Sequence, residues 1–165
     1  MSLNLEKLNE NLDAKKIYDI LNTDEEDVVC LFVGGCVRDL ISNREILDVD
    51  FATSLTPDKI KRKLEASNIE YDNSFENYGS IKVRLNEKSF EVNTLRKDFD
   101  QDGRHSEVIF TQDWRQDALR RDFTINAIYC DINGRIYDPF KGVDDLNNGI
   151  IRFIGDPIKR IQQDY

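Results

Sequence analysis

The sequence predicts an α+β fold in which a mixed sheet of about five strands carries helices on one face. Two kinds of pattern predict this class. Apolar residues recur at helical spacing over residues 4–21, and a second helix start follows at Pro57. Apolar or alternating runs typical of strands occupy residues 28–33, 46–53, 80–86 and 89–95. The 165 residues are enough for one domain with a hydrophobic core.

In the first third of the chain, a helix is expected over residues 4–21. "DEEDVVCLFV" then changes from charged to apolar, which predicts a buried strand near residues 28–33. Gly34 and Gly35 interrupt this strand, and "CVRDLIS" predicts a short helix. "ILDVDFAT" alternates apolar and acidic residues and predicts the next strand.

In the middle of the chain, Thr56 is expected to cap a helix that begins at Pro57. "SIKVRLN" and "SFEVNTL" predict a hairpin joined through Asn86, Glu87 and Lys88. Residues 96–107 are polar and contain glycine, so we expect a mobile loop there.

In the last third, "DWRQDALRRDFTINA" predicts a helix. "IYCDINGRIYDP" predicts a hairpin with a type I′ turn at Asn133-Gly134. "IIRFI" resembles a strand, and a helix is expected to begin at Asp156-Pro157. The chain ends inside this helix with no capping signal after it.

Composition narrows the classes of function. The formal net charge of −9 argues against a general nucleic-acid coat, but it is compatible with a small basic pocket and with carboxylates that hold metal ions. No apolar run has the length of a membrane span, and the N-terminus does not resemble a signal peptide. We therefore expect a cytoplasmic protein with no membrane partner.

The cysteine and histidine content excludes other sites. Three cysteines without CxxC spacing predict free, buried thiols in a reducing compartment. His105 is the only histidine, which argues against a histidine-based zinc site or a Ser-His-Asp triad.

The stretch from Phe32 to Thr53 carries the first chemical signal. On a strand, Asp48 and Asp50 point to the same side and can share divalent cations, Mg²⁺ above all. The alternative is a solvated strand face. Gly34 and Gly35 allow backbone N–H groups to approach an anion, and Arg38 lies one helical turn further on.

The alternative for these glycines is a plain turn beside a surface arginine. A phosphate cradle and metal-binding carboxylates close together in sequence favour metal-assisted phosphoryl or nucleotidyl transfer. Glu91, between Phe90 and Val92, is a candidate third acid. Its alternative is a side chain on the open face of the sheet without a chemical role.

Ordered motifs give the chain a family resemblance. "GGCVRD" with "LDVDFAT", "FEVNTLRKD", "RRDFTINAIYCD" and "DPFKGVDDL" resemble the head domain of class II tRNA nucleotidyltransferases and of bacterial poly(A) polymerases. Both belong to the polymerase β-like nucleotidyltransferases. The resemblance runs from about Val28 to Tyr165.

The resemblance implies a set of site residues. The catalytic carboxylates would be Asp48, Asp50 and Glu91, and the first two would hold Mg²⁺. The nucleotide would be bound by Gly34, Gly35, Arg38, Arg121, Asn126 and Asp164. Arg120 and Asp122 would brace the site.

The resemblance also implies a reaction and a domain layout. The 3′-hydroxyl of a tRNA would attack the α-phosphate of CTP or ATP and release pyrophosphate. Residues 1–137 would form the catalytic head, and residues 138–165 would begin the neck, which we expect to be truncated. Asp138, Gly142 and Asp145 would form a capped structural link, and Asp164 would fall in the family's nucleotide-selecting motif.

Two alternatives remain beside the CCA-adding head. "SFENYGSIKVRL" resembles the corresponding strand of CCA-adding enzymes, with Ser80 in place of a threonine, which favours tRNA over a poly(A) tail. The resemblance also implies that enzymes adding only C lack part of the loop before "RRD". Residues 97–112 are present at full length here, which favours the capacity to add A. A poly(A) polymerase head is one alternative, and a fragment that binds a nucleoside triphosphate without catalysis is the other.

Overall fold

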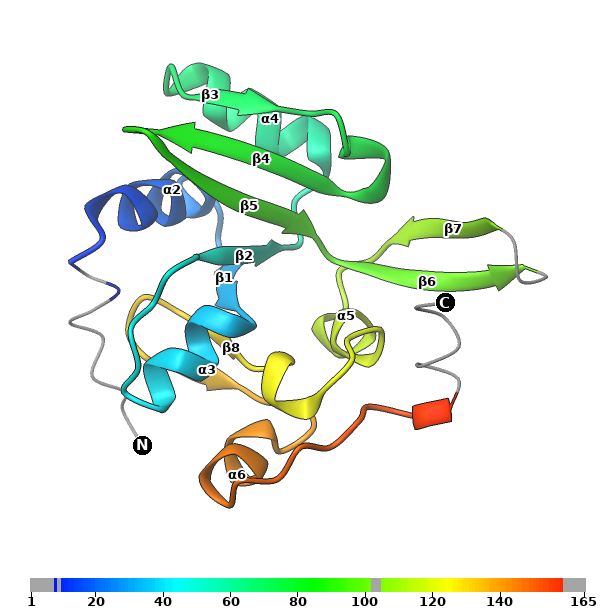
Figure 1. Ribbon diagram of the computed structural model, residues 1–165. Helices are drawn as coiled ribbons and strands as arrows, with labels where there is room; N and C mark the ends of the chain where they lie inside the picture. Colours follow the sequence, from blue (N-terminus) through cyan, green and yellow to red (C-terminus); the bar gives the residue numbers. More distant parts are fainter. Residues whose placement is uncertain (1–7, 9, 102–104, 159–165) are drawn as a thin grey trace.

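The computed structural model describes residue 8, residues 10–101 and residues 105–158 of the chain. The helices are α2 (Leu12–Asn22), α3 (Gly35–Ile41), α4 (Pro57–Ala66), α5 (Trp114–Leu119) and α6 (Gly142–Asn147), with short 3-10 helices η1 (Glu76–Tyr78) and η2 (Thr124–Asn126) (Figure 1). The strands are β1 (Cys30–Val33), β2 (Asp50–Thr53), β3 (Glu70–Asp72), β4 (Ser80–Leu85), β5 (Lys88–Thr94), β6 (Arg96–Gln101), β7 (His105–Phe110), β8 (Tyr129–Cys130) and β9 (Ile136–Tyr137).

One mixed sheet organises the molecule, in the order β3-β4-β5-β2-β1-β8-β9. β2 and β5 pair in parallel, and the other neighbours pair antiparallel. The predicted α+β class and mixed sheet are therefore confirmed. The sheet has seven strands rather than about five, because the short edge strands β3 and β9 also join it.

Three helices cover one face of the sheet. α2, α3 and α4 pack their apolar sides against alternate residues of the central strands. A row of aromatic rings crosses the strands beneath these helices. The ring centroids of Tyr18 and Phe32 lie 5.2 Å apart, those of Phe32 and Phe51 5.1 Å, and those of Phe51 and Phe90 6.4 Å. Burial of such side chains contributes about 1.5–3 kcal/mol each, so this face holds the main core.

The other face is covered only in part. α5 packs with Val33, Ala52 and Tyr129 into a smaller cluster over β1, β2 and β8. The β3-β4-β5 half stays open, and its residues on this side, such as Lys82 and Arg84, are exposed. The prediction of helices on one face therefore holds for α2, α3 and α4, whereas α5 is an addition on the opposite side.

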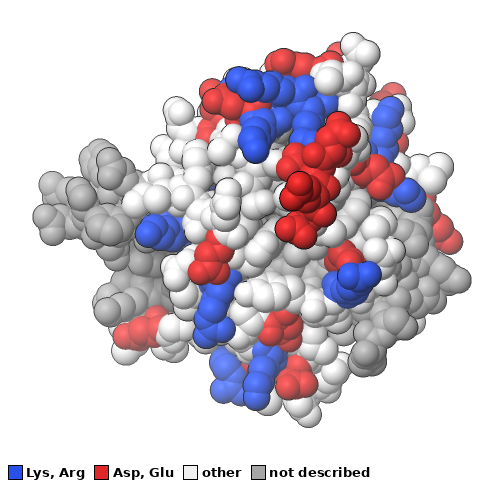
Figure 2. Space-filling model, turned by 180° about the vertical axis from the view of Figure 1, so that it is seen from behind, with Lys and Arg blue, Asp and Glu red and all other residues white. Residues whose placement is uncertain are grey.

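Figure 2 shows the molecule from behind, where basic side chains gather at the top beside acidic ones. In this part of the fold, α4 carries Lys61 and Lys63, and both are paired. Lys61 contacts Glu76 at 2.6 Å, and Lys63 contacts Glu25 at 3.0 Å. Among the described residues, no helix combines the length and apolar character that a membrane crossing requires.

The mobile loop expected at residues 96–107 is wrong for residues 96–101 and 105–107, and residues 102–104 lie outside the described part of the chain. β6 and β7 form a two-stranded antiparallel hairpin that projects from the body of the molecule (Figure 1). Backbone pairing with the partner strand orders these residues despite their polar composition. The sequence Asp102-Gly103 is also typical of hairpin turns, so a polar segment that contains glycine does not by itself indicate a loop.

The helix expected over residues 113–127 is too long. α5 ends at Leu119, and the chain then extends so that Phe123 bridges to Phe153 and Thr124 N donates to Arg152 O at 3.0 Å. The strand expected for "IIRFI" is reduced to this single bridge. Pairing between distant segments therefore overrides the local helical pattern.

The turns differ in detail from those expected. Asn86 and Glu87 both have positive φ, so the β4–β5 turn has two residues and Lys88 already belongs to the strand. The β8–β9 hairpin is confirmed, but its type I′ turn is wrong. Only Gly134 has positive φ there, and Asp131 Oδ1 accepts hydrogen bonds from the backbone N–H groups of Asn133 and Arg135.

Two helix starts agree with the sequence. Thr56 caps α4, and its hydroxyl accepts from Lys59 N. The first helix is described from Leu12 to Asn22, and the expected residues 4–7 lie outside the described part of the chain.

Candidate active site

A glycine pair joins β1 to α3. Gly34 has φ +75° and ψ −130°, a conformation that side chains disfavour, and its N–H donates to Ile128 O at 3.2 Å. A Cβ on Gly34 would lie 3.8 Å from Arg121 Nη1, and one on Gly35 would lie 3.6 Å from Arg38 Nη2. The pair therefore brings the backbone beside two guanidinium groups. α3 has only seven residues, so we assign the main positive charge beside the glycine pair to the two arginines and not to the N-terminus of this short helix.

Three carboxylates meet where β2 begins. Asp50 opens β2, and the parallel pairing sets it directly beside Glu91 of β5. On the other side Asp50 pairs with Val33, the last residue before Gly34. The pKa of Asp50 is raised to about 6, first by burial and then by the charges of Glu91 and Asp48, while the charge of Arg121 opposes the shift. The pKa of Asp50 therefore depends on Asp48, Glu91 and Arg121, three residues that the sequence predicted at the site.

The structure corrects the expected position of Asp48. It is exposed and precedes β2, rather than lying on the strand with Asp50. The β1–β2 ladder ends at the Val33–Asp50 pair because the chain turns away at Gly34. Asp48 therefore reaches the site from an irregular segment, although its charge still acts on Asp50.

Glu91 lies on the open face of the sheet. It is exposed, and Ser80 of β4 donates a hydrogen bond to Glu91 Oε1 at 2.8 Å. A place on the open face is compatible with a role of Glu91 as the third acid, because the same face carries Asp50. Ser80 holds the carboxylate from the outer side.

Arg38 is held in a defined position beside the glycines. Its Nε and Nη2 donate to Asp39 at 3.0 and 3.3 Å. Its Nη1 donates to Asn126 Oδ1 at 2.9 Å, and Asn126 Nδ2 donates to Asp122 Oδ1 at 3.2 Å. Asn126 thus links α3 to η2. Asp122 braces Asn126, as the resemblance implied.

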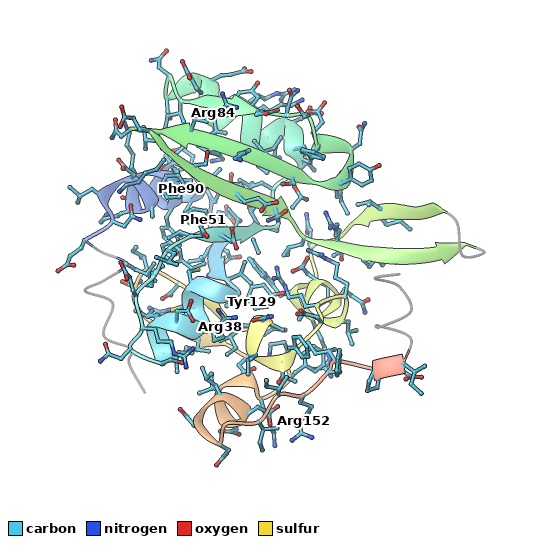
Figure 3. All side chains as sticks on the ribbon, in the orientation of Figure 1. Arg38, Phe51, Arg84, Phe90, Tyr129 and Arg152 are labelled. Atoms are coloured by element: carbon cyan, nitrogen blue, oxygen red, sulfur yellow. The ribbon has the colours of Figure 1, made fainter. Side chains whose placement is uncertain are left out.

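Arg121 is held by a buried network. Its Nη2 donates to Asp117 Oδ2 at 3.2 Å, its Nε lies 3.2 Å from Tyr129 Oη, and its guanidinium stacks 5.3 Å from the centre of the Tyr129 ring. Arg120 contacts the other Asp117 oxygen at 2.9 Å. In Figure 3 the labelled Tyr129 and Arg38 both lie below the central strands.

Asp117 is the residue that sequence reasoning missed. Its side chain is only 1% exposed, and it accepts from Arg96 N, Arg120, Arg121 and the Tyr129 hydroxyl. Burial opposes its ionisation, but the charges of Arg121 and Arg120 and the tyrosine hydrogen bond together lower its pKa. Its spacing of three and four residues from the two arginines was a usable signal.

The segment after β9 supports η2 from below. Asp138 accepts from Gly142 N at 2.8 Å and Val143 N at 2.9 Å, which caps α6. Asp145 accepts from the Thr124 hydroxyl at 2.8 Å and forms an ion pair with Arg152 at 3.0 Å. The expectation of a capped turn that holds two elements together is therefore confirmed.

The carboxylates fit a divalent cation in a limited way. Within residues 8, 10–101 and 105–158, no three His, Cys, Asp or Glu side chains form a ready metal cluster. Mg²⁺ needs only one or two carboxylates, together with waters and substrate phosphates. Asp48 and Asp50 offer this donor set, and a bound cation would offset the repulsion that Asp48 and Glu91 exert on Asp50. Asp164 lies outside the described residues.

The comparisons with known proteins agree with this geometry. The chain is 48% identical over 133 residues to "CCA tRNA nucleotidyltransferase 1, mitochondrial" of Danio rerio and 46% identical to its Homo sapiens counterpart; each match covers 80% of the chain. It is 42% identical over 135 residues, or 81% of the chain, to the CCA-adding enzyme of Lactobacillus helveticus. The chain spans about a third of the length of these relatives, 31% to 33%.

Two solved structures resemble the fold. The Bacillus stearothermophilus CCA-adding enzyme in complex with CTP matches with a TM-score of 0.79 at 34% identity, over 96% of this chain and 36% of that one. A tRNA nucleotidyltransferase complexed with a primer tRNA and an incoming ATP analog matches with a TM-score of 0.64 at 27% identity, over 81% of this chain and 37% of that one.

A family model gives the assignment its residue range. The model described as "Poly A polymerase head domain" matches residues 30–152, which include the glycine pair, the three carboxylates and both arginines. The chain therefore belongs to the poly(A) polymerase head domain family.

Proposed function

We propose that this chain is the catalytic head of a tRNA nucleotidyltransferase that adds C and A to the tRNA 3′ end from CTP and ATP with Mg²⁺, releasing pyrophosphate. One observation carries the proposal. Asp50 is flanked by Asp48 and Glu91, and the Arg121 charge also acts on it. The acids that we propose to hold the metal ion therefore lie beside the arginine that we propose to bind phosphate. Relatives of this chain are named for CCA addition, and two structural neighbours are described with CTP or with a primer tRNA.

The residues suggest how the reaction is arranged. Arg38 and Arg121 would bind the triphosphate. A guanidinium has five N–H donors, and Arg38 uses only some of them for Asp39 and Asn126, so the others can donate to phosphate oxygens. Asp48 and Asp50 would hold Mg²⁺, which when bound neutralises charge on the triphosphate and on the attacking and leaving oxygens. Glu91 would complete the carboxylate set.

The bond changes follow from nucleotidyl transfer. The RNA 3′-hydroxyl oxygen forms a bond to the α-phosphorus, and the bond from the α-phosphorus to the pyrophosphate oxygen breaks. The hydroxyl proton is lost to solvent. This chain contributes orientation and charge compensation, because no side chain forms a covalent intermediate.

Transfer to tRNA is favoured over the alternatives by the curated relatives, which are named for CCA addition. A poly(A) polymerase head and a fragment that only binds nucleotide are the competing candidates. We also propose the boundaries 1–137 for the head and 138–165 for the start of the neck, and a cytoplasmic location. The vertebrate relatives are named as mitochondrial.

The test uses the natural protein that contains this chain. It is incubated with labelled CTP or ATP, Mg²⁺ and either tRNA lacking its CCA end or an oligoadenylate. Labelled tRNA is the expected product, and Asp50→Asn is expected to abolish it without unfolding the protein. Extension of oligoadenylate alone would indicate a poly(A) polymerase. Calorimetric binding of CTP without incorporation would indicate a binding module.

A further inference from the structure

The order of the strands separates two sides of the reaction centre. Gly34, Arg38 and Arg121 lie on the β1 and β8 side of Asp50. Glu91 lies on the other side, on β5, and β4 lies beyond it. In Figure 3 the labelled residues follow this order from Arg84 through Phe90 and Phe51 to Tyr129 and Arg38.

In-line transfer makes this separation meaningful. The attacking and leaving oxygens lie on opposite sides of the phosphorus that is transferred. If the triphosphate lies against the glycine pair and the arginines, the attacking 3′-hydroxyl must approach Asp50 from the β5 and β4 side. The RNA end that carries this hydroxyl then lies over the open half of the sheet.

Two cations of β4 stand on that half of the sheet. Lys82 pairs in register with Glu91, which pairs with Asp50, so all three lie in one row across the strands. Adjacent strands are about 4.8 Å apart, which sets Lys82 roughly 10 Å from Asp50 along the sheet. Arg84 pairs with Ser89, two residues before Glu91, just as Asp48 stands two residues before Asp50.

Both side chains are available to solvent. Lys82 is exposed, and the Arg84 side chain is 60% exposed. Arg84 contacts Asp72 at 3.7 Å, a surface ion pair of little energy that a phosphate can replace. Elsewhere on this face the nearby charges are acidic: Glu70 and Asp72 on β3, and Glu91 on β5. Without these two cations, the acids Glu70, Asp72 and Glu91 would oppose the approach of an RNA strand.

We propose that Lys82 and Arg84 bind the phosphates of the acceptor strand next to its 3′ terminus and so position the attacking hydroxyl. This inference rests on the proposed function. It assigns β4 to the RNA and leaves the nucleoside triphosphate to the opposite side of Asp50. The basic residues of α4 do not serve as the same site, because α4 packs on the other face of the sheet and Lys61 and Lys63 are paired.

Variants at these two positions test the proposal in the natural protein that contains this chain. Lys82→Ala/Arg84→Ala is compared with Lys59→Ala, whose exposed lysine lies on α4. The double variant is expected to raise KM for tRNA lacking its CCA end about three- to tenfold, with KM for CTP unchanged. Lys82→Arg is expected to retain most of the tRNA affinity, because it keeps the charge.

A binding measurement separates this inference from the proposed function. Fluorescence anisotropy with the same tRNA, without nucleotide, is expected to show a shallower dependence of log K on log salt in the double variant, by roughly 0.7 per lost phosphate contact. Equal slopes and equal KM values for the double variant and Lys59→Ala would overturn the inference. A wild-type protein that binds tRNA but incorporates nothing contradicts the proposed function, and the salt slopes then decide this inference separately.

Discussion

At the scale of the residue, the site carries electrostatic strain that the fold does not relieve by itself. Asp50 is partly buried beside two other acids, and the nearest opposing charge, on Arg121, is already paired with Asp117. A folded chain keeps such an arrangement when function requires it, at the expense of stability. Asp50 and Asp117 therefore have opposite effects on stability.

We predict that Asp50→Asn stabilises the metal-free protein at pH 7.5. The pKa of Asp50 is raised to about 6, so the protonated carboxyl group favours the folded state at pH values below its ordinary pKa, and this contribution is lost as the pH rises through 6. The gain at pH 7.5 is about 1–2 kcal/mol after allowance for partial exposure, and it vanishes near pH 4. Urea unfolding in EDTA at both pH values measures it. The exposed Glu45→Gln is the control, and an equal gain in that variant would contradict the prediction.

Asp117→Ala is expected to have the opposite effect. It leaves Arg120 and Arg121 without their buried partner and removes the acceptor of the Tyr129 hydroxyl. Removal of one member of a buried ion pair costs about 3–5 kcal/mol. Thermal unfolding compared with the exposed Asp27→Ala measures this loss. A Tm within two degrees of that control would show that Asp117 does not hold the network.

At the scale of the element, contact between α6 and η2 determines how the Asn126 segment is held. Gly142, at the start of α6, faces the backbone of Thr124 so closely that only glycine fits. A Cβ there would lie 2.7 Å from the Thr124 carbonyl carbon and 2.9 Å from Ile128 Cγ1. Since η2 carries Asn126, which in turn binds Arg38, the close contact is transmitted to the candidate nucleotide site.

Gly142→Ala is therefore expected to destabilise the fold by about 3 kcal/mol, at the upper end for overpacking, because the obstacle is backbone. Gly149→Ala is the matched control. Its Cβ would meet nothing within 4 Å, and only its φ of +67° opposes a side chain, at about 1 kcal/mol. Urea denaturation ranks the two variants. A smaller effect at Gly142 than at Gly149 would show that α6 can move away from η2 at little cost.

At the scale of the whole molecule, local signals in the sequence predicted local structure well. Gly34-Gly35 and Thr56-Pro57 marked a turn and a helix start, and both were found. The resemblance also pointed to residues that the fold brings together around Asp50. Distant pairing was not predictable from one sequence: the Phe123–Phe153 bridge shortened a helix, and β6 and β7 paired where polarity indicated a loop. Asp117 was missed because its role depends on tertiary contacts.

The cysteines provide a test of the whole core. Cys30, Cys36 and Cys130 are free and buried, as the sequence predicted, and burial raises the pKa of Cys36 to about 11. A thiol reagent at pH 8 is therefore expected to label the native protein at least about 100-fold more slowly than the protein in urea, because it needs both exposure and thiolate. Rapid labelling of any of the three in the native state would contradict the packing of the main cluster.

The parallel pairing of β2 with β5 has a kinetic consequence. The chain between these strands contains α4, β3 and β4, so Asp50 reaches Glu91 only after a long loop has closed. Such distant contacts form late in folding, because loop closure must be complete before they stabilise the chain. The carboxylates therefore come together only after the long segment between β2 and β5 has folded back on the sheet. A chain in which this pairing has not formed would lack the assembled site, so acquisition of nucleotide binding would mark a late step of folding.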